Sequence, residues 1–332
     1  MGKGSKDMPF YEEKKILILI PPGTISNNKK LWGNHSDIYP VYKNSRSLNA
    51  RIKLRICLMF NRIEDVLNVE LNRNNIDKYD IIIVNEIIYP EIIIKYIRQN
   101  NKHCEIIYWL WDSVIYSGKA LLYDGNKHRK LLDSMRKAYN FKILSFDKQD
   151  CIKYGFIYHN QIAPFFEDFR LIRPIVDEVY FCGNDKGRLK NLKVIGTILK
   201  RYGIIPHFEV VPGNFGQLDN KGYEDFIFKV APKSYEELLT ETLKRTAILE
   251  LVQKNQVGIT WRALEALFYK RKLITNFKDI KNYDFYRPSN IFILGEDNEK
   301  KLSTFLSLPY ETIPKEIYEK YTFEGCISHI LE

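Results

Sequence analysis

The sequence lacks the features that would place a protein across a membrane or outside the cell. It holds no run of 18 apolar residues, so no segment is predicted to span a bilayer. The polar start has no secretory signal, and we expect residues 1–14 to be a disordered start or a vector-derived remnant. We therefore expect a cytoplasmic protein, and we leave open a peripheral contact with the inner face of the cytoplasmic membrane.

Cysteine and histidine are few, and neither is spaced to hold a metal. The six histidines show no metal-ligand spacing, so the sequence predicts neither a metal nor a cofactor. The five cysteines are odd in number and form no C-x-x-C pair, which favours free buried thiols in a reducing compartment. They are Cys57, Cys104, Cys151, Cys182 and Cys326.

Positive charge exceeds negative charge, since 51 lysines and arginines against 41 aspartates and glutamates give a net charge of +10. This balance favours anionic partners, such as a nucleotide diphosphate, a lipid-diphosphate acceptor or an acidic membrane surface. Nucleic acid comes last, because no nucleic-acid-binding motif accompanies the charge. With 45% hydrophobic residues, the chain of 332 residues can fold as two globular domains.

Strands and helices alternate along the chain. Apolar runs such as Lys15–Ile20 and Tyr79–Val84 are typical of strands buried on both faces of a parallel sheet. The same pattern predicts strands at 105–111, 141–146, 178–182, 207–211, 225–230, 247–251, 272–275 and 290–294, and helices at 47–60, 89–98, 127–137, 148–154, 189–202, 235–245, 260–269, from 299, and at 315–331. The fold class is therefore α/β. An aperiodic link at 167–177 separates two predicted domains, 15–168 and 178–310, and a helical tail, 311–332, follows.

Residues at the carboxyl ends of parallel strands are ligand-binding candidates by position. In the first domain these are Pro22 and Gly23, Asn85 and Glu86, Asp112, and Asp147. We favour Asp112 as a general base, with Glu86 and Asp147 as second choices.

The preference for Asp112 depends on its aromatic neighbours. It follows Tyr108, Trp109 and Trp111, and a carboxylate beside aromatic walls is partly desolvated, which raises its pKa toward a useful value. The alternatives are structural. Asp112 would cap the next segment through Ser113, and Asp147 would be the N-cap of the helix at 148–154.

The segment Ala247–Asn276 predicts a strand, a turn with Gly258 and Thr260, a helix and a second strand. In such a βαβ unit the helix N-terminus points into the crevice and favours a phosphate there. Arg262 lies in the first turn of that helix and Glu265 follows one turn later. This order suits a nucleotide, with the diphosphate at the helix end and the ribose on the carboxylate. The alternative is an ordinary βαβ unit whose Arg262 and Glu265 pair at i,i+3 on the helix surface.

The stretch Gln253–Leu267, with the sequence Gln-Lys-Asn-Gln-Val-Gly-Ile-Thr-Trp-Arg-Ala-Leu-Glu-Ala-Leu, resembles the donor-binding segment of GT-B glycosyltransferases, and most of all bacterial enzymes of lipopolysaccharide and capsule assembly. Val179–Arg188 resembles the strand and loop that open their C-terminal domain. The resemblance covers about the C-terminal half. It implies two Rossmann-like domains facing each other across a cleft, with 311–332 packing back on the first. It also implies metal-independent transfer of a sugar from a nucleotide-sugar donor to a glycan or polyprenyl-diphosphate-linked acceptor in O-antigen or capsule assembly.

The resemblance implies roles for residues of the second domain. Cations, and backbone that glycines let approach closely, would hold the leaving diphosphate. Glu265 would accept hydrogen bonds from the ribose hydroxyls, and Tyr235 would help to hold the base. The diphosphate residues are Gly183, Lys186, Arg188, Gly258, Thr260 and Arg262. Many retaining relatives carry a second glutamate where this chain has Val257, so the stereochemistry stays open.

Two other classes of function remain compatible with the sequence. One is a noncatalytic relative that binds a nucleotide-sugar or a glycan, and the other is a basic α/β regulator that binds nucleic acid. A sugar-nucleotide epimerase would need clustered acidic and histidine residues, which the sequence does not show. The basic helix Lys127–Lys137 is either a solvated face or a contact with a membrane-bound acceptor.

Overall fold

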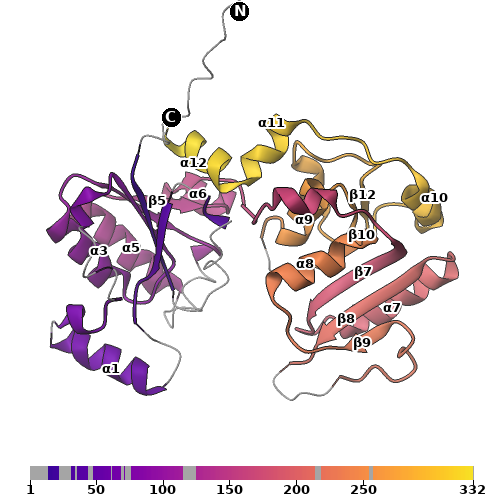
Figure 1. Ribbon diagram of the computed structural model, residues 1–332, viewed down its shortest axis with the longest axis horizontal. Coiled ribbons are helices and arrows are strands. Elements are labelled where there is room, and N and C mark those ends of the chain that lie inside the picture. Colours follow the sequence, from indigo (N-terminus) through magenta and orange to yellow (C-terminus); the bar gives the residue numbers. More distant parts are fainter. Residues whose placement is uncertain are drawn as a thin grey trace, which may run out of the picture. The chain divides into compact units, whose positions relative to one another are not determined.

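The computed structural model describes residues 14–21, 31–33, 36–43, 48–60, 62–68, 71, 76–114, 125–213, 218–253 and 257–331. The chain divides into two compact units. Unit 1 comprises Met1–Pro164 and Thr322–Glu332, and unit 2 comprises Phe165–Tyr321. Each unit is built on a parallel six-stranded sheet with helices packed beside it (Figure 1).

Unit 1 has the strand order β2-β1-β3-β4-β5-β6, and all neighbouring strands pair in parallel. The predicted strands are confirmed, because apolar runs such as those of β1 and β3 are buried at every position. The strands are β1 (Ile16–Ile20), β2 (Ser36–Pro40), β3 (Ile81–Asn85), β4 (Glu105–Trp109), β5 (Lys142–Ser145) and β6 (Ile157–Tyr158). The α-helices are α1 (Leu48–Met59), α3 (Pro90–Asn100), α5 (Gly125–Tyr139), α6 (Lys148–Tyr154) and α12 (Phe323–Leu331) in the described part of this unit.

The sequence pattern does not predict β2 and β6, which are the two edges of this sheet. β2 has the sequence Ser-Asp-Ile-Tyr-Pro and is fully buried only at its first residue, and β6 has two residues. An edge strand has one neighbour and one side open to solvent, so it needs no continuous apolar run and tolerates proline. Hydropathy alone therefore leaves both strands undetected.

Unit 2 has the strand order β12-β11-β10-β7-β8-β9, again with parallel pairs throughout. The predicted strands and helices are confirmed, with ends that shift by a few residues. The strands are β7 (Val176–Asn184), β8 (Ile205–Val211), β9 (Ile227–Lys229), β10 (Arg245–Glu250), β11 (Lys272–Thr275) and β12 (Ile291–Ile293). The α-helices are α7 (Leu189–Arg201), α8 (Tyr235–Leu243), α9 (Trp261–Phe268), α10 (Leu302–Ser307) and α11 (Lys315–Tyr318) in its described residues.

The strand order reverses next to the first strand of each unit. In unit 2, β7 lies between β8 and β10, and in unit 1, β1 lies between β2 and β3. A crevice forms outside the carboxyl ends of the strands at such a switch point, and ligands of open α/β sheets bind there. The loops after β7 and β10 in unit 2, and after β1 and β3 in unit 1, are therefore the places to look for a site.

The helix predicted at 315–331 is interrupted. α11 is followed by a 3-10 turn, Glu319–Tyr321, before α12 begins. α11 belongs to unit 2, whereas α12 belongs to unit 1. In unit 1 the ring of Phe323 meets Trp32 edge-on, with the ring centroids 5.5 Å apart.

Candidate active site

The loops that follow β7 and β10 meet at the switch point of unit 2. After β7 the backbone turns through Lys186 and Gly187, with φ of 43° and 79°, a left-handed conformation that glycine adopts easily and lysine rarely. The side-chain amide of Gln253, in the loop after β10, donates a hydrogen bond to the carbonyl of Lys186 at 3.2 Å. The structure thus brings together the two loops that the sequence singles out.

Arg188 is the cation best placed in the loop after β7. It directly precedes α7, and its guanidinium lies over the ring of Phe181, 5.8 Å from the centroid. Gly183 lies beside it, and a Cβ at that position would be in ordinary van der Waals contact with Nη1, at 3.8 Å. Burial lowers the pKa of Arg188, although Asp185 opposes the shift. Its Nε is buried and has no hydrogen-bond partner among the described residues, so this guanidinium keeps a donor for a ligand.

The start of α9 is held by a buried carboxylate, Glu250. Thr260 caps the helix by accepting a hydrogen bond from the Arg262 N–H at 3.0 Å, and its hydroxyl donates to Glu250 Oε1 at 2.5 Å. Thr275 donates to Glu250 Oε2 at 2.5 Å. Burial raises the pKa of Glu250, which is 2% exposed. The carboxylate therefore joins β10, β11 and α9.

Glu250 is a residue that the sequence analysis does not identify. The signal in the sequence that could have identified it is a lone glutamate within the apolar run Ala247–Leu251, where a charge must find partners.

Gly258, in the turn before α9, is buried with φ of 75°, which agrees with the predicted close turn.

Glu265 is fully buried, so the interpretation of a carboxylate on the helix surface is wrong. The expected i,i+3 ion pair with Arg262 does form, through Oε2. The hydroxyl of Tyr235 donates to Oε1 at 3.1 Å. Burial raises the pKa of Glu265, and the Arg262 guanidinium opposes that shift. Each carboxylate oxygen therefore has one protein donor, Tyr235 on Oε1 and Arg262 on Oε2.

Tyr235 connects helices α8 and α9. It begins α8 directly after Ser234, which forms a capping box with Glu237. Its ring also packs edge-on against Trp261 at 5.2 Å between centroids. The tyrosine therefore links the start of α8 to the first turn of α9 and to Glu265.

In unit 1 the loop after β3 shows backbone strain. Glu86 and Tyr89 have φ of 41° and 56°, values that non-glycine residues rarely adopt and that often mark functional sites. Asn85 is 2% exposed, and its Oδ1 has no hydrogen-bond partner among the described residues. Trp109, its register partner on β4, is fully buried, and its Nε1 likewise has none there. A buried acceptor and a buried donor thus adjoin Glu86, where a polar ligand can satisfy them.

The structure differs from the reasoning that led to Asp112. β4 ends at Trp109, two residues earlier than predicted, so Asp112 lies in a bend beyond the strand and is exposed rather than desolvated. Asp147 is confirmed as an N-cap, because its carboxylate accepts hydrogen bonds from the N–H groups of Gln149 and Asp150. Pro22 and Gly23 lie outside the described residues.

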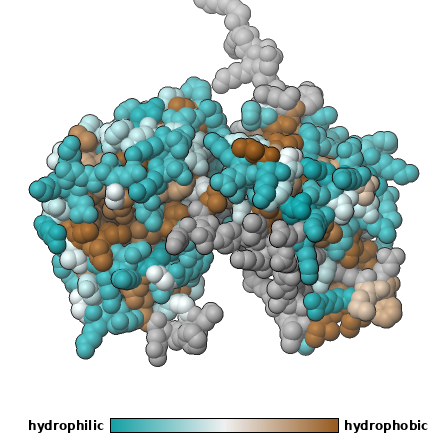
Figure 2. Space-filling model, turned by 180° about the vertical axis from the view of Figure 1, so that it is seen from behind, coloured by the Kyte–Doolittle hydropathy of each residue, from teal (hydrophilic) through white to brown (hydrophobic). Residues whose placement is uncertain are grey.

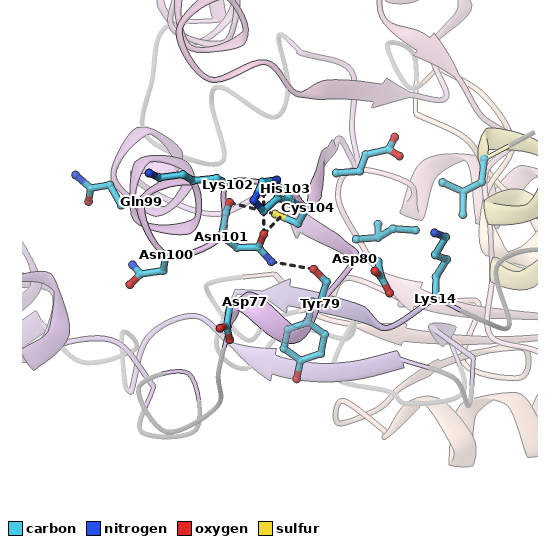
Figure 3. Close-up of a pocket in the computed structure, with 13 residues that line it drawn as sticks. Lys14, Asp77, Tyr79, Asp80, Gln99, Asn100, Asn101, Lys102, His103 and Cys104 are labelled. Atoms are coloured by element: carbon cyan, nitrogen blue, oxygen red, sulfur yellow. Dashed lines mark hydrogen bonds between the residues drawn. The ribbon is translucent and has the colours of Figure 1, made fainter.

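In unit 1 a cavity of about 650 Å³ opens beside the amino ends of β3 and β4 (Figure 3). It therefore lies at the other end of these strands from Asn85 and Glu86. Asn101 organises its wall, donating to the carbonyls of Ile76 and Tyr79 and accepting from the N–H groups of His103 and Cys104. The polar groups of this side chain are therefore used within the protein. We place the candidate site at the carboxyl ends instead, where parallel sheets bind ligands.

The basic helix α5 has both paired and exposed cations. In α5, Arg136 donates to the carbonyls of Gly155 and Tyr154 and so fastens this helix to the end of α6, whereas Lys130 and Lys137 are exposed.

All five cysteines are free thiols, three of them buried and two half-buried. Among the described residues no cluster of three or more His, Cys, Asp or Glu side chains could hold a metal ion. In the same part of the chain, no helix is long and apolar enough to cross a bilayer.

No protein-family model matches this chain, and no curated protein matches its sequence. Solved structures match nearly its full length. A glycosyltransferase involved in avilamycin A biosynthesis has a TM-score of 0.52 at 9% identity, with 96% of each chain covered. An α-glucosyltransferase in complex with UDP-glucose and DNA containing an abasic site has a TM-score of 0.59 at 14% identity, with 96% of this chain and 98% of that chain covered. The chain therefore has the GT-B glycosyltransferase fold, and the predicted α/β architecture of two Rossmann-like domains is confirmed.

Proposed function

We propose that the protein is a glycosyltransferase that moves a sugar from a nucleotide-sugar donor to a glycan or lipid-linked glycan acceptor of cell-surface polysaccharide assembly. The observation that carries the proposal is the arrangement at the switch point of unit 2. An unsatisfied Arg188 donor, the left-handed turn at Lys186 and Gly187, and the buried Arg262–Glu265 pair follow two adjacent strands. This combination fits a nucleotide diphosphate, and the fold is shared with enzymes that transfer sugars.

The leaving diphosphate would be stabilised by protein groups alone. The first N–H groups of α7 and α9 and their helix dipoles favour an anion, and Arg188 and Lys186 add positive charge. Such fixed donors stabilise charge that develops on the leaving group, which makes a metal unnecessary. Glu265 would accept the ribose hydroxyls, with Arg262 and Tyr235 holding its oxygens in place.

For the general base we now propose Glu86 ahead of Asp112. Glu86 is half-buried on the strained loop at the unit 1 switch point, next to the unsatisfied Asn85 acceptor. Partial desolvation and a fixed position suit a group that removes a proton from an acceptor hydroxyl. Glu86→Gln should therefore lower kcat at least about a hundredfold, whereas Asp112→Asn should lower it far less.

The donor site is tested with a thermal-shift screen against UDP, GDP, dTDP, CMP and ADP. A nucleotide at about 100 times its Kd should add about 2.7 kcal/mol of stability. Arg188→Gln should reduce the binding free energy of the nucleotide that gives this shift by about 1.5–3 kcal/mol, because it removes a charge-assisted contact. Arg201→Gln, an exposed arginine in the last turn of the same helix, is the matched control and should leave affinity unchanged. No shift with any nucleotide would refute the donor site, and a shift without turnover would indicate a noncatalytic relative.

A second candidate acceptor is DNA, and a specific observation favours it. Two structural neighbours with TM-scores of 0.59 and 0.53 are α-glucosyltransferases in complex with DNA, and this chain carries a net charge of +10. The two acceptor classes separate in one assay. Mass spectrometry after incubation with the donor should show sugar on a lipid-linked glycan, and sugar on an oligonucleotide containing an HMU base would favour DNA instead.

A further inference from the structure

Helix α1 has an apolar face that no described part of unit 1 covers. Leu54 and Cys57 point inward and are buried in the core of this unit. On the other side, four apolar residues are exposed by 48%, 50%, 82% and 72%, which is far more than a core-facing residue shows. They are Ile52, Ile56, Met59 and Phe60, and we call them the α1 stripe.

The α1 stripe is one continuous surface rather than scattered exposure. Its members are spaced i, i+4, i+7 and i+8, which places them on one side of a helix. Figure 2 shows apolar surface at the lower right, where α1 lies when Figure 1 is turned by 180°. Single exposed apolar residues are common in proteins, but a contiguous apolar patch marks a surface that binds something.

Positive charge flanks the stripe on both sides. At 100° per residue, Lys53 follows Phe60 on one edge and Arg55 precedes Met59 on the other. Both side chains are exposed, and Arg55 Nε donates to the Tyr89 hydroxyl at 3.1 Å, which holds it beside the helix. The sequence of α1 contains no aspartate or glutamate. The helix therefore presents an apolar strip bordered by cations.

We propose that α1 docks on a membrane surface rich in anionic lipid, with the α1 stripe in the interface and the flanking cations at the headgroups. An amphipathic helix of this kind lies in the plane of the interface and gains from both apolar burial and attraction to anionic lipid. DNA would engage the cations but gives no gain for burying isoleucine, methionine and phenylalanine. A second copy of the chain would oppose the same cations to each other across a twofold axis. The docking surface does not depend on the proposed sugar transfer.

The test is flotation of the full chain with vesicles of phosphatidylglycerol and phosphatidylcholine in equal parts. Met59→Ser/Phe60→Ser should weaken binding at least about tenfold, because it removes the most exposed part of the stripe. Leu171→Ser/Ile175→Ser is the matched control, since these residues of unit 2 are 82% and 76% exposed outside the stripe, and it should bind like the wild type. Lys53→Glu should weaken binding to the acidic vesicles, and added salt should do the same.

Four results would overturn the proposal. They are absence of wild-type binding to the acidic vesicles, an equal loss in the control variant, salt-sensitive binding to duplex DNA without vesicle binding, and a concentration-dependent dimer that Met59→Ser/Phe60→Ser abolishes. The nucleotide thermal shift, run on the same variants, keeps the two proposals apart. If the wild type floats with the vesicles but no nucleotide shifts its stability, the donor site alone is refuted. If a nucleotide shifts its stability but the wild type does not float, membrane docking alone is refuted.

Discussion

Removing Arg262 should destabilise unit 2 through the charge that it leaves behind. The side chains of Arg262 and Glu265 are 21% and 0% exposed, so Arg262→Leu strands a buried carboxylate with only the Tyr235 hydroxyl. Breaking a buried ion pair in this way costs about 3–5 kcal/mol. The pair Lys200–Asp225 is 51% and 56% exposed, and Lys200→Leu should cost less than about 1 kcal/mol.

The cost of Arg262→Leu should depend on pH, and its sign follows from the burial of Glu265. Burial already raises the pKa of Glu265 above 4.5, and removal of the opposing guanidinium raises it further. A carboxylate with a raised folded pKa loses stability as pH rises from its unfolded pKa through the folded value. The destabilisation should therefore be complete at pH 8 and shrink toward pH 5, where the buried carboxyl can protonate.

Urea unfolding at both pH values measures this difference. The double variant Arg262→Leu/Glu265→Gln should recover most of the lost free energy at pH 8 and lose the pH dependence, because no buried charge remains. Lys200→Leu serves as the control for removing a cation at the surface. A cost for Arg262→Leu below about 1 kcal/mol at pH 8, or an equal cost at both pH values, would refute the reasoning.

Three further predictions concern stability. Gly196→Ala should lower the free energy of unfolding by about 1–3 kcal/mol, because the new Cβ would stand 2.7 Å from ring carbons of Phe226, and Phe226→Leu should relieve part of that cost in a double-mutant cycle. Asp147→Ala should cost about 1 kcal/mol in urea unfolding but leave nucleotide thermal shifts unchanged, since its carboxylate caps α6. Hydrogen bonds from Lys244 and Arg245 lower the pKa of Glu241 to about 2. Its contribution to the free energy of unfolding is therefore present above pH 4.5 and is lost as pH falls toward 2. Glu241→Gln should then cost about 1 kcal/mol after allowance for solvent screening at pH 7 and less at pH 3, and an equal cost at both would contradict the assignment.

Much of the secondary structure could be predicted because its signals are local. A strand inside a parallel sheet is buried on both faces, so β1 and β3 can be predicted from their continuous apolar runs. The N-cap Asp147 can also be predicted, because capping depends on neighbours two and three residues away in the sequence. The strand-turn-helix-strand order of 247–276 likewise follows from its own apolar pattern.

Burial of individual polar side chains could not be predicted, because it depends on residues that are distant in the sequence. The i,i+3 spacing of Arg262 and Glu265 predicts their ion pair but not its burial, which needs Tyr235 from α8. Asp112 becomes exposed because β4 ends early, although its aromatic neighbours suggest the opposite.

The sequence by itself thus determined the α/β class, most strands and helices, and the segment of unit 2 that carries the candidate site, because these follow from periodicity and chain order. The tertiary structure alone decided the strand order, the two edge strands, the role of Glu250 as a link between β10, β11 and α9, and the outward face of α1. The physical reason is that a side chain's surroundings are set by which distant elements pack against it. The order of residues along one segment does not show which distant elements will pack against it.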